Sequence, residues 1–386
     1  MIGVALRMLF GDRAKYFGLI FGVTFASLVL TQQPAIFWGL MTRTYGFITD
    51  AGLADAWVMD PKVQFIDDIK PLQDTQLYRV RSVPGVGWAV PLYKGLLRAR
   101  LENGSFQSCN VIGLDDSTLI GGPATMLEGR LEDLRRADSV IVDDVGAATR
   151  LARPPRFPGD PPIPLRVGDL LELNDRRAVV VGICKVSRTF QSQPVVYTTY
   201  SRATSFAPRE RKLLSFILVG GAPGQDPAQL CARIEAQTGL AAYPREDFKW
   251  KTVTYFLKYT GIPINFGISV TLGFLVGLAI VGQTFYTFTL DNLRHFGALK
   301  AMGAGNGTLL RMIVTQALVV GLVGWGLGTG AGAMFGYVFR ESQLAFRLPI
   351  WVLVLSASAV LLITIVSSVL SLWKVMRLEP AIVFKS

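Results

Sequence analysis

Long blocks of hydrophobic residues and long blocks of polar residues follow one another along this chain. Four runs contain no charged residue, at residues 16–42, 266–290, 312–339 and 348–373. Each run is longer than the roughly 20 residues with which a helix crosses the hydrocarbon core of a bilayer. The pattern therefore predicts four transmembrane helices over these ranges.

The polar block between the first and second runs, residues 43–261, contains the patterns of both strands and helices. Short apolar runs bounded by turn residues predict strands at 110–114, 139–142, 178–184, 194–198 and 214–219. We expect helices at 73–81 and 227–238, the second with Asp226 as N-cap, Pro227 as first residue and Gly239 just past the end. The predicted fold class is an α-helical membrane protein with a mixed α+β domain inserted between transmembrane helices 1 and 2.

Two further segments of this block have distinct patterns. Residues 153–164, RPPRFPGDPPIP, are rich in proline and predict a stiff extended loop, which we interpret as a division between two lobes. Residues 247–259 are amphipathic and aromatic, which favours a helix that enters the membrane at its interface.

A short polar segment, DNLRHFGALKAMGA at residues 291–304, connects the second and third runs. Leu293, Phe296, Leu299 and Lys300 follow at intervals of three, three and one, so a helix here places an apolar stripe beside a basic face. Gly303 then ends the helix. A loop that only reverses the chain needs no such stripe, and we interpret the segment as a helix that docks on another protein.

Composition and charge give the chain its class and its orientation. It is 51% hydrophobic and 17% charged, with a mean hydropathy of +0.39, which indicates an integral membrane protein. The segments flanking the runs on one face hold nine Lys or Arg and three acids, whereas the short loop on the other face holds two and one. The basic face is cytoplasmic by the positive-inside rule. These cytoplasmic flanks contribute +6 of the net charge of +11, and the rest is spread over the short outer loop and the outer domain without a block of like charge, so we expect no nucleic acid partner.

The resulting domains are listed by residue number. We expect a cytoplasmic amphipathic helix at 1–15, an outer domain at 43–261, a cytoplasmic coupling helix and loop at 291–311, a short outer loop at 340–347 and a cytoplasmic C-terminus at 374–386. A cleaved signal peptide is the competing reading of the first run, but the run exceeds a normal signal core and no A-x-A site ends it.

Several chemical signatures are missing from the sequence. It has no GxxxxGK[ST] loop, HExxH, CxxC or GxSxG motif, and its one histidine is His295 in the segment 291–304. The four runs contain no ionisable side chain of the kind that proton-coupled transporters use. We therefore predict no catalytic residue, metal or cofactor in this chain, and we interpret Cys109, Cys184 and Cys231 as buried small hydrophobic residues.

Glycines recur at intervals of four residues in three of the runs. They are Gly18 and Gly22, Gly273 and Gly277, and Gly324, Gly328, Gly332 and Gly336. Small residues at this spacing allow close approach of membrane helices. The contact they make is either packing within one bundle or the interface of a homodimer, and the spacing leaves both open.

Residues 249–305, which begin KWKTVTYFLKY and end HFGALKAMGAG, resemble the MacB/FtsX/LolC permeases of ABC transporters, and most closely the DevC-type branch. Weaker similarities lie at 83–93, 111–116, 165–173, 179–184 and 378–384. Arg294, Gly297, Leu299, Lys300, Ala301 and Gly303 keep the family pattern of the cytoplasmic loop. His295 and Phe296 depart from it, since many relatives have Glu-Ile there.

The resemblance implies the permease subunit of an ABC exporter in the bacterial inner membrane, with its large domain in the periplasm. ATP and magnesium would be bound by a separate ATPase, which docks on Leu293, Arg294, His295, Phe296, Gly297, Leu299, Lys300, Ala301 and Gly303. By mechanotransmission a homodimer of the permease would move a lipophilic or glycolipid-like substrate outward through a periplasmic adaptor and an outer-membrane channel. A lipoprotein-releasing permease and a non-transporting FtsX-like transmitter to a cell-wall hydrolase remain alternatives, and a membrane-bound enzyme ranks last.

Overall fold

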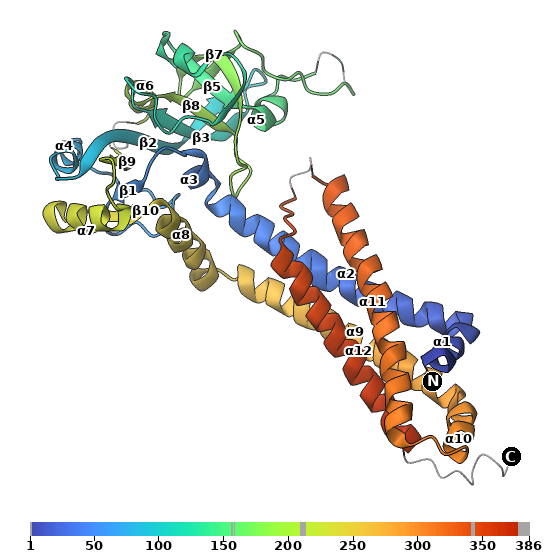
Figure 1. Ribbon diagram of the computed structural model, residues 1–386. Helices are drawn as coiled ribbons and strands as arrows, with labels where there is room; N and C mark the ends of the chain where they lie inside the picture. The colour runs from blue at the N-terminus through green and yellow to red at the C-terminus, as the bar shows by residue number, and fades with distance from the viewer. Residues whose placement is uncertain (1, 156, 158, 209–213, 341–343, 377–386) are drawn as a thin grey trace. The chain divides into compact units, whose positions relative to one another are not determined.

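The computed structural model describes residues 2–155, 157, 159–208, 214–340 and 344–376, and the chain divides into two compact units (Figure 1). Residues 1–40 and 261–386 form the helical unit, and residues 41–260 form the α/β unit.

The helical unit contains six helices among its described residues. They are α1 (Ile2–Gly11), α2 (Arg13–Thr44), α9 (Ile262–Asp291), α10 (Leu293–Ala301), α11 (Asn306–Val338) and α12 (Ile350–Met376), with the end of α2 lying in the other unit. Four of them, α2, α9, α11 and α12, are long and apolar enough to cross a membrane, which confirms the predicted number. Most begin before the predicted run, because flanking residues such as Arg13 and Arg311 continue a helix past its apolar core.

Apolar side chains from the long helices meet in one cluster. Leu19, Val23, Phe285, Val320 and Ile363 are all buried in it, each less than 2% exposed. The helix α12 packs along both α9 and α11 (Figure 1). Every long helix thus contributes to a single helical core.

The α/β unit is built on a ten-stranded sheet with the order β10-β1-β9-β2-β3-β8-β5-β7-β4, in which β6 pairs with β2 and β7. Its strands are β1 (Ala56–Met59), β2 (Val86–Arg100), β3 (Phe106–Leu114), β4 (Thr125–Glu128), β5 (Ser139–Asp143), β6 (Leu170–Leu173), β7 (Arg176–Lys185), β8 (Val195–Thr199), β9 (Phe216–Gly221) and β10 (Ala241–Pro244). The pairs β3–β8 and β5–β7 are parallel and the other pairs are antiparallel. All five predicted strands are present, and β1, β2, β4, β6 and β10 were not predicted.

The long strand β2 joins two halves of this sheet. It pairs with β9 up to Leu92 and with β3 from Tyr93 onward. The prediction that residues 153–164 divide two lobes is wrong, because β5 before them and β7 after them are neighbours in one sheet. The segment is instead a loop within one sheet, and backbone hydrogen bonds between Arg153 and Ile163 join its two ends.

Helices of the α/β unit cover the sheet. They are α3 (Gly46–Asp50), α4 (Thr75–Arg81), the 3-10 helix η1 (Leu131–Arg135), α5 (Asp144–Ala148), α6 (Tyr200–Phe206), α7 (Pro227–Thr238) and α8 (Arg245–Tyr259). The predicted ends of α7 are confirmed: the Asp226 carboxylate accepts the Gln229 N–H at 3.3 Å, and Gly239 has a φ of 70°. The predicted aromatic helix is α8, whose Phe248 packs on Trp57 in the core.

Candidate functional site

The segment between α9 and α11 forms a separate short helix, α10, at one end of the helical unit (Figure 1). Only Asn292 separates α10 from α9. The Asn292 Nδ2 donates a hydrogen bond to the Phe288 carbonyl at 2.9 Å. Gly303 follows α10 with a φ of 92°, a conformation that costs glycine little. Residues 291–304 thus form a short helix that ends before a glycine, as the sequence predicts.

The apolar stripe of α10 faces the chain's own core. Phe296 is 1% exposed and packs against Ala5 of α1 together with Leu309, Met312 and Ile313 of α11. Leu293 and Leu299 are half-buried against the same cluster, and Gly297 is buried. The stripe that suggested a docking surface is therefore used mainly for packing inside this unit.

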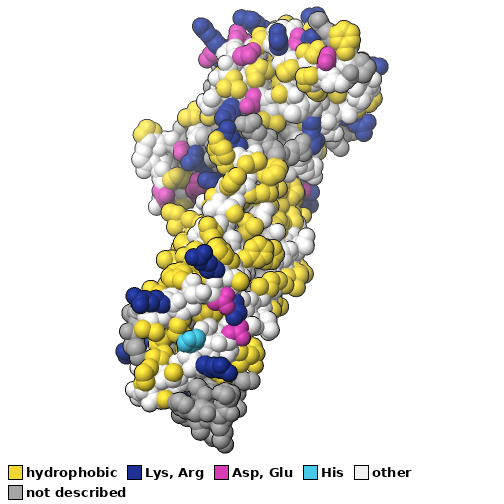
Figure 2. All heavy atoms as spheres, turned by 90° about the vertical axis from the view of Figure 1, so that its right-hand side faces the viewer, with side chains coloured by type: hydrophobic (Ala, Val, Ile, Leu, Met, Phe, Trp, Pro, Cys, Tyr) yellow, Lys and Arg dark blue, Asp and Glu magenta, His cyan; other side chains and the backbone are white. Residues whose placement is uncertain are grey.

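The other side of α10 is open to solvent. Arg294, His295, Ala298 and Ala301 are exposed, as are Met302 and Gly303 after it, whereas Lys300 is half-buried. Figure 2 shows the histidine, in cyan, at the surface of this end of the unit, with dark blue Lys and Arg and magenta Asp and Glu side chains around it. Of the predicted docking residues, Arg294, His295, Ala301 and Gly303 are therefore exposed to a partner, while Ala298 and Met302 are exposed beside them although they were not predicted.

Polar contacts fix the elements around α10 to one another. The Lys15 ammonium of α2 forms ion pairs with Asp12 at 2.7 Å and with Asp291 of α9 at 2.5 Å. Hydrogen bonds from Lys15 hold the pKa of Asp12 below its usual value. The Gln316 Nε2 of α11 donates to the Ala5 carbonyl of α1 at 2.7 Å. These contacts link α1, α2, α9 and α11 around the short helix.

All eight glycines singled out in the sequence lie against other segments of the same chain. Gly18 and Gly22 face α9, Gly273 and Gly277 face α2, Gly324, Gly328 and Gly332 face α2, and Gly336 faces Phe346. A Cβ atom on Gly328 would lie 2.5 Å from the Ser27 Cβ and 2.6 Å from the Thr24 carbonyl oxygen. The glycines therefore let α2 approach both α9 and α11 closely.

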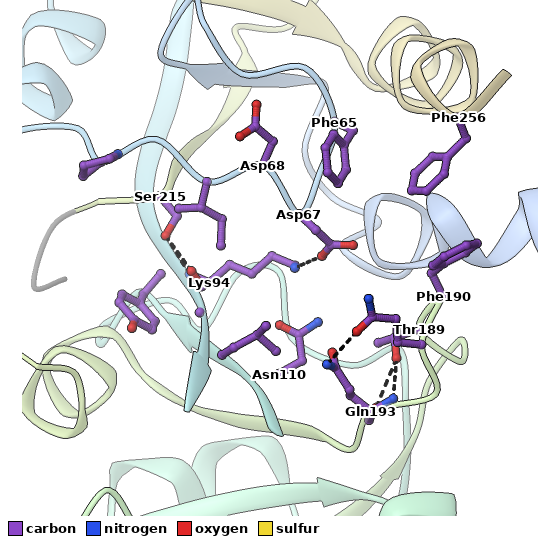
Figure 3. Close-up of a pocket in the computed structure, with 16 residues that line it drawn as sticks. Phe65, Asp67, Asp68, Lys94, Asn110, Thr189, Phe190, Gln193, Ser215 and Phe256 are labelled. Atoms are coloured by element: carbon purple, nitrogen blue, oxygen red, sulfur yellow. Dashed lines mark hydrogen bonds and ion pairs between the residues drawn. The ribbon is translucent and has the colours of Figure 1, made fainter. Parts of the chain in front are cut away.

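The α/β unit contains a second candidate site, a cavity of about 660 Å³ that the sequence did not indicate (Figure 3). Its walls come from residues 65–71, the middle of β2, Asn110 of β3, residues 189–193, Ser215 and Phe256 of α8. These segments are far apart in the chain, and only the sheet brings them together.

Charged groups at the cavity occur in pairs. Lys94 is 3% exposed and its ammonium contacts the Asp67 carboxylate (Figure 3), while Asp68 pairs with Lys70 at 2.8 Å. The backbone of Lys94 is held by Ser215, whose hydroxyl accepts the Lys94 N–H at 2.9 Å and donates to its carbonyl at 3.0 Å. The lining itself contains two carboxylates and one ammonium group, and Lys70, outside the lining, balances the second carboxylate.

Uncharged polar and aromatic side chains complete the lining. Phe256 contacts Phe65 and Phe190 with ring centroids 5.4 and 4.9 Å apart. Asn110 is 4% exposed, and its Oδ1 has no hydrogen-bond partner among the described residues. The lining thus offers both hydrogen-bonding groups and apolar surface.

The remaining candidate chemistry among the described residues is that of metal ligands and thiols. Among them, no group of three or more His, Cys, Asp and Glu side chains could hold a metal ion. Cys109, Cys184 and Cys231 are buried and unpaired as thiols, as the sequence indicates. Burial raises the pKa of Cys109 and of Cys231 to about 12, so both thiols are protonated at neutral pH.

Two family descriptions match the chain in series. Residues 16–237 match the MacB-like periplasmic core domain, and residues 267–380 match the FtsX-like permease C-terminal region. Two uncharacterized ABC transporter permeases of Mycobacterium tuberculosis are 25% and 24% identical to it, each over 95% of this chain and 93% of the relative. An uncharacterized ABC transporter permease of Methanocaldococcus jannaschii is 24% identical over 50% of this chain and 52% of its own.

Two solved structures with some likeness to the chain are described as extracytoplasmic domains. The periplasmic region of MacB from Actinobacillus actinomycetemcomitans has a TM-score of 0.37 and 17% identity over 55% of this chain and 96% of its own. The extracellular domain of the noncanonic ABC-type transporter YknZ from Gram-positive bacteria has a TM-score of 0.34 and 12% identity over 50% of this chain and 98% of its own.

The family resemblance seen in residues 249–305 is thus confirmed for the MacB/FtsX group, while the DevC-type branch stays a prediction. The helices α2, α9, α11 and α12 and the mixed α/β unit agree with both matched regions. With a MacB-like periplasmic core domain over more than half of its length and an FtsX-like region after it, the chain belongs to the family of MacB/FtsX-type ABC transporter permeases.

Proposed function

We propose that this chain is the membrane subunit of an ABC exporter of the DevC type, which passes motion from a separate ATPase to the α/β unit. A permease of this family implies an ATPase partner. The observation that carries the proposal is the two-sided packing of α10: Phe296 anchors it in the core, while Arg294, His295 and Ala298 stay exposed. A partner that moves the exposed side moves the anchored helix with it.

The chain provides a direct route for such motion. The helix α10 follows α9 after one residue, and only Thr260 and Gly261 separate α9 from α8 of the α/β unit. We infer that the α10 end is cytoplasmic and the α/β unit periplasmic, since nine Lys and Arg flank the spans on the α10 side. The work is mechanical, with ATP and magnesium bound by the partner.

The proposal includes the assembly and the cargo. ATPase domains of this class act in pairs, so the permease would work as a homodimer. A lipophilic or glycolipid-like substrate would leave through a periplasmic adaptor and an outer-membrane channel. These partners follow from the resemblance of residues 249–305 to the DevC-type branch.

The test is co-purification of the ATPase with the tagged full chain. A charge at Phe296 would enter the chain's own core, so the exposed Ala298 is the better position for a variant. We expect Ala298→Trp to abolish co-purification and permease-dependent ATP hydrolysis. Ala236→Trp, at an exposed alanine of α7, is the matched control and should keep both. Unchanged co-purification in the two variants would refute docking on α10.

A further inference from the structure

We propose that the cavity in the α/β unit binds a small amphiphile with an apolar tail and an uncharged, hydroxyl-bearing head. The inference deepens the proposed function, because an exporter needs a site that recognises its cargo. The volume of about 660 Å³ lies within the range of about 300–1,000 Å³ that is usual for small-molecule sites.

The first observation is the Asn110 side chain. It is 96% buried, its Oδ1 has no partner among the described residues, and it lies in the wall of the cavity (Figure 3). A buried amide without a partner costs stability, and a strand position of this kind is ordinarily apolar. A bound hydroxyl group would supply the missing hydrogen bond, since it can both donate and accept.

The second observation is the cancellation of charge around this amide. The Lys94 ammonium faces Asp67, and the Asp68 carboxylate is paired with Lys70. An anionic head would approach two carboxylates, and a cationic head would compete with Lys94 for Asp67. An uncharged head avoids both costs and can still hydrogen-bond to these groups.

The third observation is the apolar part of the lining. Phe65, Phe190 and Phe256 form a connected aromatic group, and Ile69 and Leu96 extend the apolar surface. Leu96 is 49% exposed although it faces the cavity from the middle of the sheet. An alkyl or similar apolar tail would cover these side chains and remove their surface from water.

The experiment uses the full chain in lipid nanodiscs and an octyl β-glucoside that carries a diazirine on its alkyl chain. After illumination, mass spectrometry locates the modified residues. We expect modification in residues 65–71, in residues 189–193 or at Phe256. Unlabelled octyl β-glucoside should compete, whereas octyl sulfate and octyltrimethylammonium, with the same tail and charged heads, should not. Modification confined to α2, α9, α11 and α12 would overturn the site, and competition by a charged head would overturn the uncharged class.

A variant pair tests the head-group contact. Asn110→Leu keeps the number and branching of the side-chain heavy atoms and should lower modification of the cavity at least tenfold. Gln237→Leu makes the same carboxamide-to-apolar change at an exposed residue of α7 and should leave it unchanged. Equal modification in the two variants would show that Asn110 does not bind the head group. The assay contains no ATPase, so its failure would refute the cavity site while the docking of α10 could still stand.

Discussion

The interiors of the two units differ in packing: the helical unit is closely packed, whereas the α/β unit contains a cavity. In the helical unit, glycines bring helices so close that a Cβ on Gly328 would lie 2.5 Å from Ser27, and the buried Gln316 donates to Ala5. In the α/β unit, a cavity of about 660 Å³ stays open beside Asn110, a buried amide whose Oδ1 bonds to no described group. The first arrangement suits a block that moves as one body, and the second suits recognition of a ligand at some cost in stability.

We expect the largest loss of stability at Phe296, a fully buried side chain of the helical unit. Phe296→Ala removes a side chain that is 1% exposed, and we expect it to lower the free energy of unfolding by about 3–5 kcal/mol. Hydrogen exchange in α1 and α10 should rise in parallel. Met302→Ala, at a side chain 76% exposed, is the control and should change neither. Equal behaviour of the two variants would contradict the packing of α10 on α1.

A smaller effect is expected at the glycine contacts. Gly328→Ala places a methyl group against Ser27 and the Thr24 carbonyl, which should cost about 1–3 kcal/mol by overpacking. Gly330→Ala, two residues away, meets nothing within 4 Å and should stabilise α11 by up to about 1 kcal/mol. Thermal unfolding of the full chain in nanodiscs measures both. A loss of stability at Gly330 as large as at Gly328 would mean that the close approach is not the cause.

The side-chain oxygens of both buried amides, Asn110 and Gln316, have no hydrogen-bond partner among the described residues, but the Gln316 NH2 group donates to another helix. The two should therefore respond with different signs to the same replacement. Gln316→Leu loses the hydrogen bond to Ala5 and should destabilise the chain by about 1 kcal/mol. Asn110→Leu loses no hydrogen bond to a described residue, so stability should stay the same or rise by up to about 1 kcal/mol. Destabilisation by Asn110→Leu would show that the amide has a structural role.

Asn110→Cys places a thiol in the wall of the cavity. Of the substitutions in the two interiors, we expect it to change the free energy of unfolding least. Adjacent residues of a strand point to opposite faces, so Cys109 lies in the core while residue 110 lines the cavity. With a pKa of about 12, only about one Cys109 in ten thousand is a thiolate at pH 8. Cys184 and Cys231 are also buried, and burial raises the pKa of both thiols. Methyl methanethiosulfonate should therefore modify Asn110→Cys once per chain and leave the parent chain unmodified, as measured by intact mass. Equal labelling of both chains would mean that the core is as accessible as the cavity.

Sequence patterns were sufficient where a feature depends on neighbouring residues. Asp226, Pro227 and Gly239 specify the ends of α7, and the uncharged runs specify the four long helices. The strand β2 was not predicted, because Pro91, Lys94 and Gly95 interrupt its apolar alternation. The spacing of Leu293, Phe296 and Leu299 identified an apolar stripe, although periodicity could not say whether it faces a partner or the chain's own α1.

The cavity could not be read from the sequence for a different physical reason. Phe65, Asn110, Phe190 and Phe256 belong to four distant segments, and each one alone resembles an ordinary core or loop residue. The one local signal was a lysine at position 94 within an otherwise apolar stretch. Its burial and its pairing with Asp67 depend on the folded sheet.

The change of partner along β2 has a mechanical consequence for this cavity. Main-chain pairing with β9 ends at Leu92, pairing with β3 begins at Tyr93, and the Ser215 hydroxyl bridges to the backbone of Lys94 beyond the end of β9. One strand thus connects the two halves of the sheet, and Lys94 lies next to the point where its partner changes. The proposed ligand of the cavity would contact β2, β3 and Ser215 together, and would so brace the sheet at the point where its main-chain pairing changes.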